Sequence, residues 1–400
     1  MARDAGPRKD PSNGTWWFVV DLPPAPDGRR RQAKRRGFTT KAAAQGALDE
    51  LRVESRQGTY VAPFRQTVAE FLRHDWLPAV RRQLAESTWE SYERNIRHHV
   101  EPRIGQLQLS ALDGSILNRL YGELLESGRV RGSQSPGLKP RTVRYVHTIV
   151  HAALKDAVRW RRLPMNPADQ ATPPSAKASK PPEMKVWTGP QLADFLDRLG
   201  DDRYRWPWLF LATTGCRRGE ALGLRWQDVD FERRLVAIRQ ELIPLTKPSG
   251  RGREGRLVPR TKTERPRVIE LDGPTVAALR TWRVKHTKER LLVGDAYEDH
   301  DLVFCWPDGR PYHPEAFSKT FDRRLRQAAF ADLPRIRLHD LRHTWATLAL
   351  VAGVDVKVVS ERLGHASPLI TWQTYQHVIK GMQTDAAEKV AALIFGTTTA

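Results

Sequence analysis

The sequence predicts a multidomain, mainly α-helical protein with α+β parts. Its 400 residues are enough for two to four domains and at least one substantial core. Apolar residues at helical spacing cover most of the chain, whereas strand-like runs are confined to two regions. We therefore expect a small sheet-plus-helix unit, a helical bundle, and a larger, mostly helical unit with a small antiparallel sheet, in that order.

The first predicted unit, residues 1–62, combines a short sheet with one helix. G-T-W-W-F-V-V-D-L, residues 14–22, is typical of a strand, and a proline-rich connection leads to a second strand that ends near residue 38. A helix then begins with Thr39 or Thr40 as its N-cap.

The second predicted unit, residues 63–165, is a bundle of four helices, because four segments space their apolar residues three and four positions apart. Ser87 and Glu90 fit a capping box at the start of the second helix. Residues 166–184 follow as a stiff, proline-rich linker. The third unit, residues 185–400, is mostly helical around a strand-rich insert at about 234–271.

The charge of the chain indicates a polyanionic partner. The formal net charge is +20, from 66 Lys and Arg against 46 Asp and Glu, and nucleic acid fits this excess. Each cluster of basic residues could also be a solvated loop, but the overall excess of positive charge favours contacts with phosphate groups. The predicted DNA contacts are Arg29, Arg30, Arg31, Lys34, Arg35, Arg36, Lys139, Arg141 and Arg144.

The sequence does not predict a membrane protein, a disulfide-linked protein or a metal-binding protein. No run approaches the roughly 18 apolar residues of a spanning helix, and the first ten residues lack the apolar segment of a signal peptide. We therefore expect a cytoplasmic protein that binds no membrane. Cys216 and Cys305 are the two cysteines, and neither belongs to a Cys-x-x-Cys or Cys/His spacing. The sequence thus predicts no disulfide and no metal site.

One stretch of the third unit places polar groups beside an apolar helix face. In L-H-D-L-R-H-T-W-A-T-L, residues 338–348, apolar residues at i, i+3, i+7 and i+10 predict an amphipathic helix. At about 100° per residue, Arg342 falls beside the apolar stripe and His339 just beyond it. Taken alone, this pattern also fits an ordinary helix with a surface His and Arg.

Four further motifs lie in the same unit. T-G-C-R-R-G-E carries Arg217 after a Thr-Gly turn and Glu220 one helical turn later. P-R-T-K-T-E-R-P-R-V-I-E-L puts Lys262 near the tip of a strand hairpin. L-G-H ends a helix with a glycine cap and His365 directly after it, and T-Y-Q-H carries Tyr375 on a short helix.

In their order and approximate spacing, these five motifs resemble those of the tyrosine recombinases, also called the phage integrase family. The resemblance covers nearly all of the chain. It implies an arm-type DNA-binding domain at 1–62, a helical core-binding domain at 63–165 and a catalytic domain at 185–400. The implied activity is site-specific recombination through a 3′-phosphotyrosyl intermediate, which integrates or excises a phage or mobile element without a cofactor.

Carried over residue by residue, the resemblance assigns a role to each motif. The nucleophile falls on Tyr375, the phosphate-binding arginines fall on Arg217 and Arg342, and Glu220 matches the acidic position that braces the site. The predicted catalytic residues are Arg217, Lys262, His339, Arg342, His365 and Tyr375.

The chemistry of these side chains suits cleavage of a phosphodiester. Forked guanidinium groups match phosphate geometry and can neutralise its oxygens as the transition state forms. A phenol of pKa near 10 needs help to ionise, and His339 is the candidate for that proton transfer. Lys262 would protonate the leaving 5′-oxygen, and His365 would donate a hydrogen bond to the phosphate.

Two features depart from the family pattern. Cys216 stands where a larger apolar residue is commoner, and a longer insert at about 244–259 shifts the hairpin boundaries around Lys262. His343 and His377 are interpreted as surface residues or as neighbours outside the site.

Two other functions remain open at this point. A type IB topoisomerase uses the same attack but rejoins the original ends, and a non-catalytic DNA-binding protein could keep the fold. The arm-like unit favours the integrase over the topoisomerase, and the six catalytic positions argue against a binding protein. The resemblance also implies a homotetramer on double-stranded DNA, with an excision factor and a DNA-bending protein as further partners.

Overall fold

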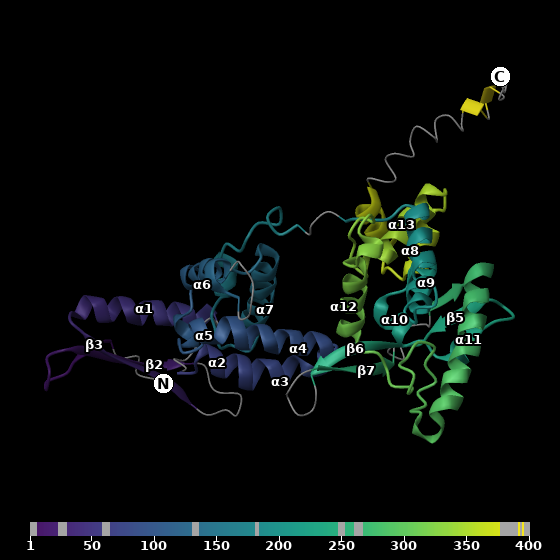
Figure 1. The fold of residues 1–400 in the computed structure, drawn as a ribbon. Coiled ribbons are helices and arrows are strands. Elements are labelled where there is room, and N and C mark those ends of the chain that lie inside the picture. The colour runs from purple at the N-terminus through teal and green to yellow at the C-terminus, as the bar shows by residue number, and fades with distance from the viewer. Residues whose placement is uncertain are drawn as a thin grey trace. The chain divides into compact units, whose positions relative to one another are not determined.

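The computed structural model describes residues 6–22, 30–57, 65–129, 136–180, 184–246, 253–259, 267–376, 391–392 and 394–395. The chain forms two compact units, Met1–Pro181 and Pro182–Ala400 (Figure 1). Within the described residues, most elements are helices and the strands form three small sheets. The predicted class, mainly α with α+β parts, is therefore confirmed.

The N-terminal part of the first unit is an antiparallel sheet with one helix packed on it. The strand of residues Trp16–Leu22 buries Phe18, Val20 and Leu22 against the helix, because successive residues of a strand point to opposite faces. Thr40 accepts a hydrogen bond from the Ala43 amide, as expected of the helix N-cap. The elements are β1 (Arg8–Lys9), which the sequence did not predict, β2 (Trp16–Leu22), β3 (Arg31–Phe38) and α1 (Lys41–Gln57).

The rest of the first unit is a helical bundle with a core of its own. A capping box forms at Thr67 and Glu70. The box predicted at Ser87 and Glu90 is wrong, because that helix begins at Glu86. The helices are α2 (Val68–Glu70), α3 (Leu77–Val80), α4 (Glu86–Asn95), α5 (Glu101–Ile104), α6 (Gly114–Ser127) and α7 (Pro140–Arg159), with π-helical turns at Phe71–Trp76 and Ile96–Val100 and 3₁₀ turns at Arg81–Gln83, Leu109–Ala111 and Pro167–Gln170.

The second unit is mostly helical. A capping box at Thr188 and Gln191 begins its first helix. Residues 368–376 form a further helical segment that carries Tyr375. The helices are α8 (Gly189–Arg198), α9 (Arg205–Thr214), α10 (Arg218–Leu222), α11 (Gly273–Val293), α12 (Pro314–Leu325), α13 (Asp340–Val351) and α14 (Val356–Leu363), with 3₁₀ turns at Trp226–Asp228, Gly294–Ala296 and Ala328–Phe330.

Among the described residues of the second unit, all strands except Val229–Asp230 fall in the insert expected at about 234–271. The strand Leu235–Ile238 pairs with Val229–Asp230 on one side and with Arg267–Glu270 on the other. The strands Gln240–Thr246 and Arg253–Pro259 form a separate antiparallel hairpin. Lys262 lies outside the described residues. The strands are β4 (Val229–Asp230), β5 (Leu235–Ile238), β6 (Gln240–Thr246), β7 (Arg253–Pro259) and β8 (Arg267–Glu270).

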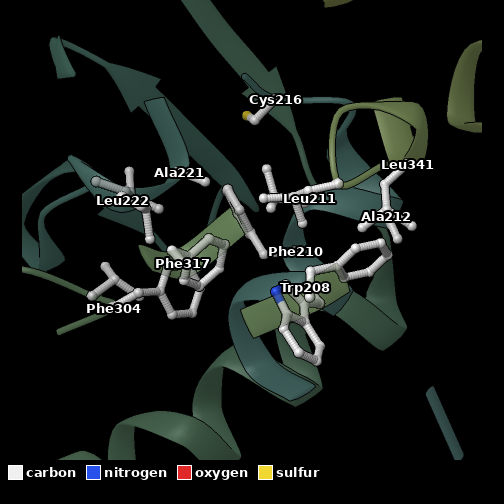
Figure 2. Close-up of a cluster of buried hydrophobic side chains, with 14 of the residues drawn as sticks. Trp208, Phe210, Leu211, Ala212, Cys216, Ala221, Leu222, Phe304, Phe317 and Leu341 are labelled. Atoms are coloured by element: carbon white, nitrogen blue, oxygen red, sulfur yellow. The ribbon is translucent and has the colours of Figure 1, made fainter. Parts of the chain in front are cut away.

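A cluster of buried side chains fixes the helices of this unit to one another. One buried cluster contains Trp208 and Phe210 of α9 together with Phe317 of α12, Leu222 of α10 and Leu341 of α13 (Figure 2). Burying a large apolar side chain contributes about 1.5–3 kcal/mol relative to leaving it in water. This packing holds the ends of α9 and α10 and the start of α13 in place, and these ends carry the candidate site.

Candidate active site

Arg217 lies in the turn between α9 and α10. The turn begins at Gly215, which has a left-handed conformation with φ of 67°. A Cβ atom at this position would meet Leu363 at 2.9 Å and Trp345 at 3.0 Å, so both the conformation and the close packing require glycine. Arg217 is the N-cap residue of α10, and its side chain is 39% exposed. The turn therefore presents a guanidinium group to solvent.

Glu220 is buried and fixes the orientation of Arg217. Its carboxylate accepts hydrogen bonds from the Arg217 amide and guanidinium, each at 2.9 Å, and forms an ion pair with Arg267. Burial acts to raise the pKa of the Glu220 carboxyl, but Arg267 and the Arg217 hydrogen bonds outweigh it and lower that pKa. The carboxylate therefore stays ionised between two arginines.

Arg267 is a part of this arrangement that the sequence analysis missed. It is the first residue of β8, its side chain is 9% exposed, and it also donates a hydrogen bond to the Arg362 carbonyl. The available signal was a basic residue at the start of an apolar strand in the R-V-I-E-L motif. Arg267 thus joins β8, α10 and α14 through its guanidinium group.

Arg342 of α13 is a buried cation held by main-chain oxygens. It donates hydrogen bonds to the Gly215 and Leu363 carbonyls, both at 2.7 Å, and only 4% of the residue is exposed. Burial, followed by the charge of Arg217, lowers the pKa of Arg342 to about 10. The guanidinium group therefore remains charged at neutral pH.

His365 follows directly after the glycine that ends α14. Gly364 has a left-handed conformation with φ of 66°, as the L-G-H motif predicted, and its carbonyl accepts a hydrogen bond from Arg217 at 3.0 Å. The His365 Nδ1 atom lies 2.7 Å from the Thr371 hydroxyl. Partial burial, and then Arg342 and Arg217, lower the pKa of His365 to about 4, so its ring is neutral at pH 7.

His339 lies at the N-terminal end of α13 and remains exposed. The neighbouring groups displace part of the water around its ring, and this desolvation, followed by the charge of Arg342, lowers the pKa of His339. Together with Arg217 it lines a pocket of about 390 Å³ against β6 and α12. An imidazole and a guanidinium group therefore face the same open space.

Tyr375 is enclosed by apolar side chains. It has no exposed surface and belongs to a cluster with Ala346 and Leu350 of α13 and Leu363 of α14. Burial raises the pKa of Tyr375 to about 12, against an opposing effect of Arg342. Its hydroxyl oxygen lies 2.7 Å from the Nδ1 atom of His343, a residue that the sequence analysis left outside the site.

The structure brings five of the six predicted catalytic residues into one region of the second unit. The charges of Arg217 and Arg342 act on the pKa values of both His339 and His365, and Arg342 also acts on Tyr375. Lys262, the sixth, lies outside the described residues.

The predicted basic contacts on β3 point to two faces of the N-terminal sheet. Arg31 and Arg35 pair with Leu22 and Phe18, on the face where α1 packs, whereas Lys34 and Arg36 pair with β2 residues on the opposite face. On that opposite face, Lys34 and Arg8 stack over the Trp17 ring at 4.7 and 5.8 Å. Arg30 is exposed and forms an ion pair with Asp21, and Arg29 lies outside the described residues.

The other three predicted DNA contacts lie at the start of α7. Lys139 is the N-cap residue of this helix, and Lys139, Arg141 and Arg144 are all exposed. Arg144 also donates a hydrogen bond to the Pro174 carbonyl at 2.9 Å. Three cationic side chains thus surround the first turns of one helix.

The described part of the chain contains neither a candidate membrane-spanning helix nor a candidate metal cluster. Among those residues, no helix is long and apolar enough to cross a membrane. Within the same ranges, no group of three or more His, Cys, Asp or Glu side chains is arranged to hold a metal ion.

Comparison with known proteins gives matches along most of the chain. The phage integrase family matches residues 190–382, an arm DNA-binding domain matches 8–55, and a SAM-like N-terminal domain of phage integrases matches 67–125. A XerC-like tyrosine recombinase of Caldanaerobacter subterraneus subsp. tengcongensis is 25% identical over 389 residues, which cover 94% of this chain and 96% of that protein. An integrase of Saccharopolyspora erythraea is 26% identical over 439 residues, covering 96% of each.

Solved structures share the fold. The Tn1549 transposon integrase in complex with transposon right end DNA has a TM-score of 0.61 at 19% identity and covers 80% of this chain and 100% of that one. A lambda integrase tetramer bound to a Holliday junction has a TM-score of 0.54 at 13% identity and covers 94% and 95%. With the family matches and the similar relatives along nearly its whole length, the chain belongs to the phage integrase family of tyrosine recombinases, which are site-specific DNA strand transferases.

Proposed function

We propose that this chain is an integrase that cuts and rejoins double-stranded DNA at the attachment sites of a phage or mobile element, through a 3′-phosphotyrosyl intermediate. The observation that carries the proposal is the grouping of Arg217, Arg342 and two histidines in the unit that carries Tyr375. Two forked cations in one place suit the oxygens of a single phosphodiester.

Each side chain has a role in the proposed reaction. The Tyr375 oxygen bonds to phosphorus, the bond from phosphorus to the 5′-oxygen breaks, and Arg217 and Arg342 neutralise the non-bridging oxygens. His339 takes the phenol proton, Lys262 supplies a proton to the 5′-oxygen, and His365 donates a hydrogen bond to the phosphate. Glu220 supports this arrangement by keeping Arg217 in place.

The covalent intermediate makes the reaction reversible. The phosphotyrosyl bond conserves the energy of the broken phosphodiester, so the 5′-hydroxyl of another strand can attack it and join. This chemistry requires neither ATP nor a divalent metal. Strand exchange then needs two pairs of active sites, and we propose a homotetramer on DNA, with an excision factor and a DNA-bending protein as further partners.

The domain assignments are part of the same proposal. Residues 1–62 bind arm-type sites, 63–165 bind the core site, 166–184 link the two units, and 185–400 catalyse the reaction. The exposed cations of β3 and of the first turns of α7 support DNA contacts in the first two. We expect the protein to act in the cytoplasm.

A covalent adduct tests the proposed function. The full-length protein is incubated, in the presence of a chelator, with a nicked duplex that carries its core site, and the products are separated on a denaturing gel. We expect a DNA–protein adduct that Tyr375→Phe abolishes. Tyr121→Phe is the matched control, because Tyr121 is also buried and hydrogen-bonded to a histidine, but lies in the first unit. An adduct formed by Tyr375→Phe would exclude this nucleophile.

A further inference from the structure

The enclosure of Tyr375 conflicts with direct attack on DNA. A nucleophile must approach the reacting phosphorus to about 3–3.5 Å. Tyr375 is 0% exposed, packed against residues of α13 and α14. No phosphate of a bound duplex can reach the hydroxyl in this arrangement, so the structure represents a resting state that must open.

His343 holds the hydroxyl in that resting state. Its Nδ1 atom lies 2.7 Å from the Tyr375 oxygen, and the two rings are tilted at 57° with centroids 5.8 Å apart. The phenol is the donor, because no other hydrogen-bond acceptor for it exists among the described residues and a buried hydroxyl without one is costly. The imidazole is then neutral, with its own hydrogen on Nε2.

The proton cannot pass to His343 in this arrangement. Burial, and then His339, lower the pKa of His343 to about 4, although Asp340 acts in the opposite direction. Arg342 and Arg337 lower it further. Since the pKa of Tyr375 is about 12, the proton stays on the phenol and the oxygen is a poor nucleophile.

We propose that His343 is a positioning residue that holds Tyr375 in a closed, neutral state, and that attack on DNA requires the hydroxyl to leave His343. This inference rests on the proposed function, because it takes Tyr375 as the nucleophile. A buried hydrogen bond of this kind typically favours the closed state by roughly ten- to a hundredfold. His343 thereby sets how often the nucleophile is exposed.

The chain contains a matched control for this contact. In the first unit, the Tyr121 hydroxyl lies 2.8 Å from the Nδ1 atom of His147, and Tyr121 is 2% exposed. Burial raises the pKa of Tyr121, as it does for Tyr375. A change at His147 therefore has a comparable effect on packing without touching the proposed site.

The first test observes the phenol itself. 3-Fluorotyrosine is placed at position 375 of the full-length protein, and its fluorine resonance is titrated with pH. His343→Leu removes the acceptor and His343→Gln moves it away from the δ position, whereas His343→Asn keeps an oxygen there. We expect the first two to move the resonance, and the phenol pKa, toward the values of the unfolded chain, whereas His343→Asn and His147→Leu do not. An unchanged signal in both His343→Leu and His343→Gln overturns the proposal.

The second test measures cleavage. At saturating nicked core-site duplex, we expect His343→Leu and His343→Gln to form the covalent adduct at least threefold faster than the unaltered protein, with unchanged DNA affinity. His343→Asn and His147→Leu should stay within twofold. An unchanged or slower rate in His343→Leu and His343→Gln overturns the proposal, because His343 would not then restrain the nucleophile.

The two proposals fail in different ways. If Tyr375→Phe still forms the adduct, or the unaltered protein forms none on its own site, the proposed function is wrong. The fluorine titration does not depend on cleavage and still decides whether His343 holds the phenol closed.

Discussion

At the scale of single residues, the site depends on arginines that are buried or anchored and yet charged. Arg342 uses two of its five N–H groups on the Gly215 and Leu363 carbonyls, which leaves others for phosphate oxygens. Its pKa of about 10 keeps it protonated at neutral pH. The planar geometry of the guanidinium group, and not its charge alone, therefore determines which oxygens Arg342 can bind at the same time.

The exchange Arg342→Lys tests this dependence on geometry. An ammonium group has no planar fork and cannot reproduce both carbonyl contacts. We expect the free energy of unfolding to fall by about 1–3 kcal/mol and adduct formation to fall by about a hundredfold or more. Urea unfolding and the adduct assay measure the two effects, with the exposed Arg326→Lys as control. Adduct formation at the unaltered rate would contradict the prediction.

Two neutral histidines predict an acid-sensitive fold. The pKa values of His343 and His365 are lowered to about 4 in the folded chain, from 6.5. Between these values the unfolded chain binds protons that the folded chain does not. The free energy of unfolding should therefore be highest above about pH 6.5 and fall as the pH drops toward 4. Urea unfolding between pH 7.5 and 4.5 measures this slope, which His365→Asn should reduce, and an equal slope in that variant would count against the assignment.

Sequence motifs predicted those candidate residues that belong to short local patterns. Arg217 follows a Thr-Gly turn, Arg342 lies beside the apolar stripe of an amphipathic helix, and Tyr375 falls in the short T-Y-Q-H motif. His343 and Arg267 were missed because their partners, Tyr375 and Glu220, lie 32 and 47 positions away, and such pairs meet only when the chain folds.

At the scale of elements, the two faces of β3 show what local patterns leave out. The basic run of β3 was predicted as a set of DNA contacts, but the strand pleat sends Lys34 and Arg36 to one side and Arg31 and Arg35 to the other. β1 has only two residues, too few for any alternation to be visible in the sequence. By contrast, the sequence predicted the glycines after α9 and α14, because a left-handed residue at the end of a helix is usually glycine.

The exchange Gly215→Ala tests the turn that carries Arg217. Alanine suffers the strain of the left-handed conformation and also places a Cβ atom against Leu363 and Trp345. Gly353→Ala is the matched control, since Gly353 has φ of 84° but nothing within 4 Å of a new Cβ. We expect Gly353→Ala to cost about 1–2 kcal/mol of unfolding free energy and Gly215→Ala to cost more and to reduce adduct formation. Equal losses in urea unfolding would show that close packing at Gly215 is unimportant.

At the scale of the whole molecule, the chain has separate hydrophobic cores in its two compact units. The bundle core includes Leu154, and the core of the second unit includes Leu279, each almost fully buried. Each unit therefore has its own source of stability.

Matched core substitutions test this independence. Leu154→Ala and Leu279→Ala should each destabilise one unit by about 2–5 kcal/mol through the cavity that they leave. In calorimetry of the full chain without DNA, we expect each variant to lower a different unfolding transition. A single transition that both variants lower equally would mean that the two units unfold together.

The anchors of the arginine cluster are backbone atoms. Carbonyl oxygens of Gly215, Arg362, Leu363 and Gly364 hold Arg342, Arg267 and Arg217. Every amino acid supplies a carbonyl oxygen, so these hydrogen bonds do not depend on which side chain the accepting residue carries. The position of this cluster therefore depends on the path of the backbone after α9 and α14 more than on the side chains around it.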